Sequence, residues 1–150
     1  MHGATIKIIG VSIFIHRNIK YNSINIDEWN TDKDIEACAI QLDSTYNEII
    51  CILNIYISPM DDFKNFLERL DFILQKLYNN KYNIICGNVN VNCLTENNRK
   101  SQLDAVLHSY NLASTVKFPT RIGLNCHTAI DNYSLIHPLL RNMSMIYTVL

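Results

Sequence analysis

The chain has 150 residues, of which 48% are hydrophobic and 18% are charged, and its formal net charge is -1. This composition predicts one globular domain with a packed core and excludes a disordered chain. The small net charge provides no overall positive field, so any contact with nucleic acid would depend on a local group of Lys and Arg side chains.

The first half of the chain has the pattern of β-strands. Residues 6–15 are rich in β-branched side chains and end at a polar stretch that begins with His16, which predicts a strand buried on both faces. This run is too short to cross a bilayer, so we expect no membrane segment. Residues 36–42 and 48–56 have the same character and predict an antiparallel hairpin.

A helix is predicted directly after the hairpin. Pro59 ends the second strand, and the carboxylates of Asp61 and Asp62 suit a helix N-terminus. Apolar side chains then recur at spacings of three and four, which places them on one face of an amphipathic helix. They are Phe63, Phe66, Leu67, Leu70, Ile73, Leu74 and Leu77.

The second half of the chain combines strands, a helix and loops. Residues 82–87 predict a short apolar strand that leads into a polar turn at residues 88–90. The apolar side chains from Leu103 to Tyr110 predict a second helix. Residues 112–118 predict a further strand, and a loop opens at Pro119.

Together these elements predict an α/β fold, a two-sheet β-sandwich flanked by helices. The apolar pattern loses its period after Asn132. We therefore expect one domain over residues 1–132 and a divergent tail over residues 133–150.

The five cysteines include no CxxC pair, and three of them lie in apolar, strand-like runs. They are Cys38, Cys51, Cys86, Cys93 and Cys126. This usage predicts buried, reduced thiols in an intracellular protein, either nuclear or cytoplasmic.

Two strand ends carry side chains that suit phosphate binding. Gly87 would let the backbone turn close to a ligand, and the amides of Asn88 and Asn90 could hydrogen-bond phosphate oxygens or a nucleophilic water. Tyr56, near the end of the preceding strand, could donate its hydroxyl to a phosphate oxygen. The alternative is structural, because asparagine is common in turns and tyrosine is often a half-buried aromatic.

The loop after the second helix contains a third candidate region. Thr120 and Arg121 follow Pro119, and Asp131 lies just past a short apolar run. Asp131 could bind a metal or orient a histidine, and the alternative is a solvated carboxylate that caps a turn. None of the five histidines has the spacing of zinc ligands, so we expect no structural zinc site.

These segments occur in an order that resembles the endonuclease domain of arthropod-type non-LTR retrotransposons, in the endonuclease/exonuclease/phosphatase superfamily. The matching segments are residues 10–15, 54–59, 84–90, 118–121 and 128–132. The resemblance implies two packed β-sheets flanked by helices, with the active site at one end. It also implies a DNA endonuclease that hydrolyses a phosphodiester with Mg²⁺ and is fused to a reverse transcriptase in the complete element.

The resemblance implies roles for individual residues. Tyr56 matches the family tyrosine that contacts the scissile phosphate, and Asn90 matches the asparagine of the Gly-Asp-x-Asn motif that helps to position it. Asp131 is similar to a later family aspartate that precedes the final strands. Thr120 matches a family threonine near the site, and Arg121 beside it is expected to bind substrate.

Departures from the family pattern predict that the chain has lost most or all of its nuclease activity. Asn88 stands where the family has an aspartate, and an amide cannot accept the proton of the attacking water. Ile57 replaces the usual arginine after the tyrosine, which removes a charge that could bind phosphate. The amide at Asn88 is nevertheless expected to belong to the same site.

Two further family features have no counterpart, so we expect a copy that is incomplete at both ends. The metal-binding glutamate of the family would lie before residue 1, which leaves the metal ligands unassigned. His137 does not follow an aspartate, unlike the terminal Asp-His pair of the family. The alternatives are a non-catalytic remnant that binds nucleic acid or a protein, and a chain that does not fold stably because a sheet edge is exposed.

Overall fold

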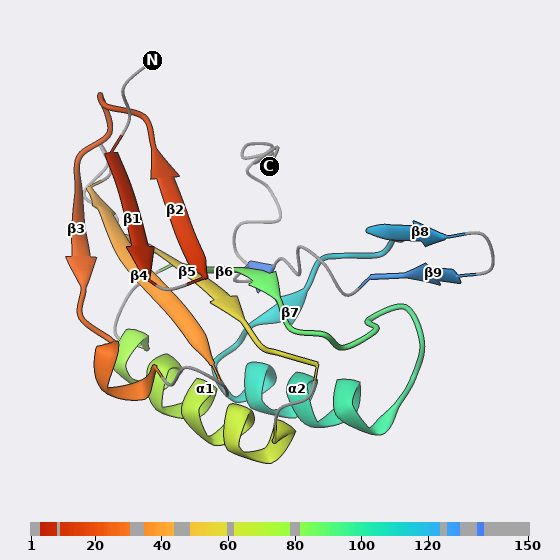
Figure 1. The fold of residues 1–150 in the computed structure, drawn as a ribbon. Coiled ribbons are helices and arrows are strands. Elements are labelled where there is room, and N and C mark those ends of the chain that lie inside the picture. The colour runs from red at the N-terminus through yellow and green to blue at the C-terminus, as the bar shows by residue number, and fades with distance from the viewer. Residues whose placement is uncertain are drawn as a thin grey trace.

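The computed structural model describes residues 4–8, 10–30, 35–43, 49–59, 62–78, 82–123, 126–129 and 135–136. Its elements are arranged as Figure 1 shows. They are β1 (Ala4–Ile8), β2 (Val11–Ile15), β3 (Tyr21–Ile24), η1 (Asp27–Trp29), β4 (Glu36–Asp43), β5 (Ile49–Tyr56), α1 (Phe63–Leu77), β6 (Tyr82–Asn88), α2 (Asn98–Ser109), β7 (Ala113–Ser114), β8 (Arg121–Gly123), β9 (Cys126–Thr128) and β10 (Leu135–Ile136).

A six-stranded sheet forms the centre of the described structure, with the strand order β3-β4-β5-β6-β10-β7. β5 and β6 run parallel, and every other neighbouring pair in this sheet runs antiparallel. α1 is the crossover that joins the parallel pair, as parallel strands require. The carboxyl ends of β5 and β6 therefore lie side by side at one edge of the sheet.

The two faces of the central sheet are covered differently. α1 and α2 cover one face, and the β1–β2 hairpin lies against β4 and β5 on the other (Figure 1). The predicted α/β fold with two sheets and flanking helices is therefore confirmed. The helices lie on one side of the central sheet and the second sheet lies on the other.

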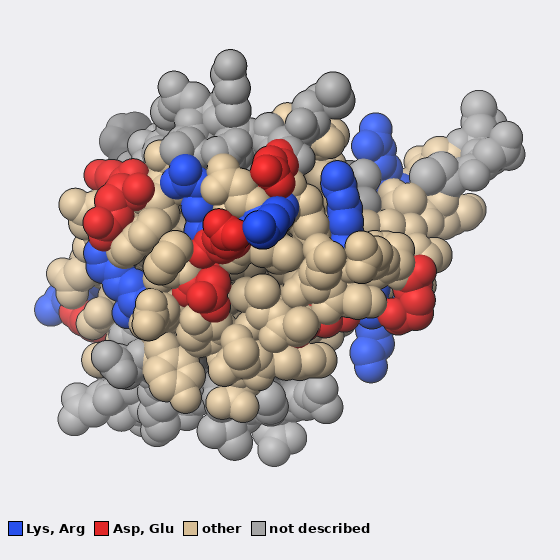
Figure 2. Space-filling view, turned by 90° about the horizontal axis from the view of Figure 1, so that it is seen from below, with Lys and Arg blue, Asp and Glu red and all other residues tan. Residues whose placement is uncertain are grey.

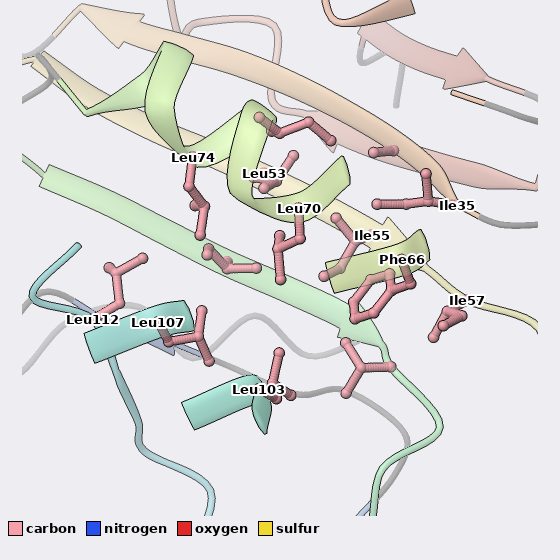
Figure 3. Packing of buried hydrophobic residues seen from close by; sticks show 14 of the residues in the cluster. Ile35, Leu53, Ile55, Ile57, Phe66, Leu70, Leu74, Leu103, Leu107 and Leu112 are labelled. Carbon is pink, nitrogen blue, oxygen red and sulfur yellow. The ribbon is translucent and has the colours of Figure 1, made fainter. Parts of the chain in front are cut away.

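The main core lies between the central sheet and the helices (Figure 3). Alternate residues of β5 point into it, namely Cys51, Leu53 and Ile55. From α1, Phe66 and Leu70 meet them. Every one of these five side chains is no more than 2% exposed, so each contributes on the order of 1–3 kcal/mol through burial of apolar area.

The predicted amphipathic helix is confirmed as α1, and its first turn is capped as expected. The Asp62 carboxylate accepts hydrogen bonds from the backbone N–H groups of Lys64 and Asn65, at 3.0 and 3.4 Å. α2 begins in the same way, because the Asn97 side-chain oxygen accepts a hydrogen bond from the backbone N–H of Lys100 at 2.9 Å. These caps fix where the two helices begin relative to the ends of β5 and β6.

The outer surface of the helices carries charges of both signs. Figure 2 shows acidic and basic side chains interspersed over this face. Lys100 lies 2.8 Å from a Glu96 oxygen and 3.0 Å from an Asp104 oxygen, and these partners raise its pKa. A mixed surface of this kind gives no uniformly positive field, so the described helix face is a poor candidate for binding a polyanion.

The predictions for the strands need one correction. The predicted hairpin of residues 36–42 and 48–56 is confirmed as β4 and β5. The prediction of one doubly buried strand over residues 6–15 is wrong, because the chain turns near Gly10 and forms the β1–β2 hairpin. Phe14 is 74% exposed, so the apolar run does not have two buried faces. β-branched composition identifies strand character but does not place the turn.

The C-terminal half also differs in part from the expected elements. The predicted strand over residues 112–118 is limited to Ala113–Ser114, and the expected loop after Pro119 contains the β8–β9 hairpin. Leu135–Ile136 pairs with both β6 and β7 in the central sheet, although its sequence pattern gave no such sign. The division of the chain at residue 132 stays a prediction. None of the described helices is long and apolar enough to cross a membrane.

Candidate functional site

The candidate site lies at the edge where the parallel strands β5 and β6 end. Tyr56, the last residue of β5, is paired with Asn88, the last residue of β6. On the other side of Tyr56, Glu36 is its partner at the start of β4. Because directly opposed residues in a sheet point to the same face, these three side chains form one cross-strand row. We call Glu36, Tyr56 and Asn88 the rim row.

Gly87 allows β5 and β6 to remain close up to the rim. Its φ is +125°, a conformation that side chains strongly disfavour. A Cβ atom at this position would lie 1.8 Å from the carbonyl oxygen of Ile55, which is its partner on β5. Only glycine fits without moving the backbone, so the sequence expectation of a turn that needs Gly87 agrees with the geometry.

The turn after β6 is held by the two asparagines. The Asn90 backbone N–H donates to the Asn88 side-chain oxygen at 2.8 Å, and the Asn90 side-chain amide donates to the Ile57 carbonyl. The Ile57 backbone N–H donates to the Asn88 carbonyl at 3.0 Å. Asn90 has a φ of 50°, which asparagine tolerates better than most residues. The asparagines therefore have a structural role, which is compatible with a second role in binding phosphate.

The position after Tyr56 faces away from the rim row. Ile57 is 3% exposed and belongs to the main core with the helices. Its side chain lies on the opposite side of the sheet from Tyr56, as the alternation of a strand requires. Residue 57, where the family resemblance would lead us to expect arginine, is therefore an apolar core residue, and its side chain does not reach the face that carries the rim row.

The row behind the rim is neutral and tightly packed. It consists of Cys38, Asn54 and Cys86, which are paired across β4, β5 and β6. The Asn54 amide donates to the Ser12 carbonyl at 3.0 Å and so links the central sheet to β2. Burial raises the pKa of Cys38 to about 12, with a further contribution from nearby Cys86, and burial raises the pKa of Cys86 to about 11. Both thiols are protonated at neutral pH.

The other cysteines with described side chains support the same conclusion. Cys38, Cys51 and Cys93 are buried and Cys86 is half-buried, and none of these four residues forms a disulfide. Burial raises the pKa of Cys51 to about 11. These four residues agree with the prediction of reduced thiols, and the raised pKa values of Cys38, Cys51 and Cys86 keep those three thiols protonated at neutral pH.

Thr120 and Arg121 lie beyond the turn, at the base of the β8–β9 hairpin. The Thr120 backbone N–H donates to the Thr128 carbonyl at 2.9 Å. The next residue, Ala129, donates to the Asn92 side-chain oxygen at 3.3 Å and accepts from the Cys93 backbone N–H at 3.2 Å. This ladder fixes Thr120 to the loop that follows Asn90, while Arg121 is exposed at the start of β8.

Asp131 and His137 lie outside the described residues, so their roles stay predictions. His127 is exposed on β9. Within the described ranges, no group of three or more His, Cys, Asp or Glu side chains is arranged to hold a metal ion. Any metal site among these residues would therefore need other oxygen ligands or water.

Glu36 is the member of the rim row that sequence reasoning missed. Its Oε2 atom is buried and has no hydrogen-bond partner. Carboxylate, phenol and amide oxygens are hard donors of the kind that Mg²⁺ prefers, so the residues present fit this cation. The predicted hairpin already placed Glu36 at the start of one strand and Tyr56 at the end of the next, which is the same end of the hairpin, but only the structure gives the register that pairs them.

Comparisons with known proteins show which solved structures have a similar fold. No protein-family model matches the sequence, and neither does any curated protein sequence. The endonuclease domain of TRAS1, a telomere-specific non-LTR retrotransposon, is similar in structure, with a TM-score of 0.68 at 13% sequence identity. The match covers 86% of this chain and 59% of that domain.

Two further solved structures have a similar fold. The catalytic domain of human Nocturnin has a TM-score of 0.54 at 17% identity, over 85% of this chain and 52% of that one. An endonuclease/exonuclease/phosphatase family protein from Bacteroides thetaiotaomicron has a TM-score of 0.54 at 13% identity, over 85% of this chain and 55% of that one. The chain thus spans between 52% and 59% of these three structures. It has the fold of the endonuclease/exonuclease/phosphatase superfamily, as its sequence predicted.

Proposed function

We propose that the chain is descended from the endonuclease domain of a non-LTR retrotransposon and binds a DNA phosphodiester at the rim row. The observation that carries this proposal is the pairing of Tyr56 with Asn88 where β5 and β6 end, directly before the Asn90 turn. The shared fold with the TRAS1 endonuclease domain supports it. In the complete element the domain would be joined to a reverse transcriptase.

Each residue has a defined task in this proposal. Tyr56 donates its hydroxyl to a non-bridging phosphate oxygen, and Asn90 keeps the turn in the conformation that presents this phosphate to the rim. Thr120 and Arg121 contact the DNA backbone on either side, where Arg121 supplies a positive charge. Asp131 acts at the same site as a carboxylate. Mg²⁺, when bound, supplies positive charge that stabilises the developing negative charge on the phosphate.

We further propose that hydrolysis is strongly impaired by the amide at Asn88. A carboxylate at this position could orient the attacking water and take its proton, whereas an amide can only orient it. General base catalysis is worth about 10²–10⁴-fold in rate. The chain would then bind DNA more effectively than it cleaves it, which also makes a non-catalytic binding function the second candidate.

A plasmid-nicking assay with Mg²⁺ tests this proposal. We expect little nicking by the wild-type chain and an increase of about 10²-fold or more in Asn88→Asp, because the carboxylate keeps the acceptor for the Asn90 N–H and gains a base. The double variant Asn88→Asp/Tyr56→Phe is the control and should lose the gain. Robust nicking by the wild type would contradict the impairment.

Fluorescence anisotropy with duplex DNA in EDTA tests binding separately. We expect an affinity that falls as salt is raised, because released counterions accompany each phosphate contact. Arg121→Gln should weaken binding and reduce the salt dependence, and Arg17→Gln, at an exposed position in the β2–β3 connection, is the matched control. Failure to bind DNA even at low salt would overturn the proposed function.

A further inference from the structure

We propose that Glu36 is the carboxylate that holds a divalent cation at the rim row, a role in which its orphaned oxygen gains a partner. This inference rests on the proposed function, since it assigns the cation to the same phosphate-binding edge. The sequence resemblance gives Glu36 no role. In this proposal Glu36 supplies a carboxylate ligand from β4.

The position of Glu36 follows from strand register. Glu36 is opposite Tyr56 in the antiparallel pair, and Tyr56 is opposite Asn88 in the parallel pair. Opposed side chains on one face lie about 4.5–5.5 Å apart at their Cβ atoms. A single ion bound to the Glu36 carboxylate would thus lie within reach of a phosphate held by Tyr56.

The start of β4 is fixed, so the backbone that carries Glu36 is held in place. The Asn30 side chain accepts a hydrogen bond from the Ala37 N–H at 2.6 Å and donates one to the Ala37 carbonyl at 2.9 Å. Both backbone groups of Ala37, the residue after Glu36, are therefore held by Asn30. Gly10, beside the β1–β2 turn, covers the carboxylate, since a Cβ there would lie 2.4 Å from Oε2. The Oε2 atom of Glu36 thus lies against the β1–β2 turn.

None of the described residues that are paired with Glu36 across the strands, or that follow it on its face of β4, carries a positive charge. The Glu36 Oε2 atom is buried without a hydrogen-bond partner, and such an oxygen loses its hydration without compensation. Its neighbours in the rim row, Tyr56 and Asn88, carry no positive charge, and the next residue on the same face of β4 is the buried thiol Cys38. A cation from solution would satisfy the carboxylate.

Mg²⁺ and Mn²⁺ fit this arrangement better than cations that need most of their ligands from protein side chains, because the rim row offers one carboxylate. Mg²⁺ is commonly bound through one or two carboxylates together with water and substrate phosphate oxygens. One carboxylate in the rim row is therefore sufficient when a phosphodiester is present. The structural alternative is that Glu36 only anchors the β1–β2 turn.

Binding of Mn²⁺ to the full chain, measured by electron paramagnetic resonance without DNA, tests the inference. We expect Glu36→Gln to weaken Mn²⁺ binding by about tenfold or more, because the amide keeps the shape but loses the charge. Glu68→Gln is the matched control, since Glu68 is exposed on α1 and paired only loosely with Lys64, at 3.7 Å. This control should bind Mn²⁺ as the wild type does.

Unchanged Mn²⁺ binding in Glu36→Gln, or no binding by the wild type, would overturn the inference. If Glu36→Gln does not fold, Mn²⁺ binding is measured in Gly10→Ala instead, because the new methyl group of this variant displaces the Glu36 carboxylate. Weaker Mn²⁺ binding in a folded Gly10→Ala supports the inference, and wild-type binding refutes it. DNA affinity in EDTA is independent of the metal, so loss of the metal role and loss of the proposed function can be told apart.

Discussion

The two faces of strand β5 have different tasks. One face carries Leu53 and Ile55, which are buried against the helices, and the other carries Asn54 and Tyr56, which are half-buried and polar. Both sets come from one stretch of eight residues, because successive side chains of a strand alternate between faces. The stability of the domain and its candidate chemistry therefore depend on neighbouring residues but on separate contacts.

This separation predicts that substitutions on the two faces have different consequences. Changes on the helix face should lower the free energy of unfolding, whereas changes at the rim should alter ligand binding in a chain that remains folded. Gly87 is the exception, because its backbone serves both the packing of β5 against β6 and the shape of the turn.

Gly87→Ala should have the largest effect. The new Cβ would overlap the Ile55 carbonyl, and the positive φ adds strain, so we expect a loss of at least about 3 kcal/mol or failure to fold. Urea unfolding followed by circular dichroism measures this loss. Gly10→Ala is the control, since its Cβ meets only the flexible end of Glu36. Similar stability of the two variants would contradict the role assigned to Gly87.

Leu53→Ala and Tyr56→Phe compare the two faces directly. Leu53→Ala removes a side chain that is 1% exposed and should cost about 2–5 kcal/mol through lost burial and a cavity. Tyr56→Phe removes one hydroxyl at the rim and should cost less than about 1 kcal/mol, while weakening DNA binding. Chemical unfolding and DNA anisotropy on the same samples give both quantities. Equal losses of stability would show that the two faces are not separate.

Asn54→Ala should loosen the contact between the two sheets. The variant loses the hydrogen bond to the Ser12 carbonyl, for an expected cost of about 0.5–1.5 kcal/mol. Hydrogen exchange of the β2 amides should become faster, and the amides of α1 should be unaffected. Asn22→Ala, at an exposed position on β3, is the matched control. Unchanged exchange in β2 would mean that Asn54 does not hold the hairpin.

Alkaline pH should have the smallest effect per group. Burial raises the pKa of Cys51 and Cys86 from 9.0 to about 11 in the folded chain, so unfolded chains ionise these thiols first. Their contribution to the free energy of unfolding is fully present below pH 9 and is lost as the pH rises through 11. Cys86→Ala should reduce the slope of unfolding free energy against pH above pH 9. An unchanged slope would show that Cys86 is not the group that titrates.

Elements with strong local signals can be predicted from the residues alone. The spacing of apolar residues from Phe63 to Leu77 specified α1 because a helix repeats every 3.6 residues, and Asp62 specified its start through capping. The β-branched, apolar character of residues 36–42 and 48–56 identified the β4–β5 pair. The order of short segments also predicted the superfamily fold, which the structural comparisons support.

Which strand ends meet, and which elements cover each face of the central sheet, depends on contacts between residues far apart in the chain. Glu36, Tyr56 and Asn88 are far apart in the chain, and strand register alone makes them neighbours. The same holds for β10, a pair of residues whose place in the central sheet depends on the edges that β6 and β7 offer. Pairing between strands is set by contacts distant in sequence, so a local pattern can identify a strand without specifying its partner.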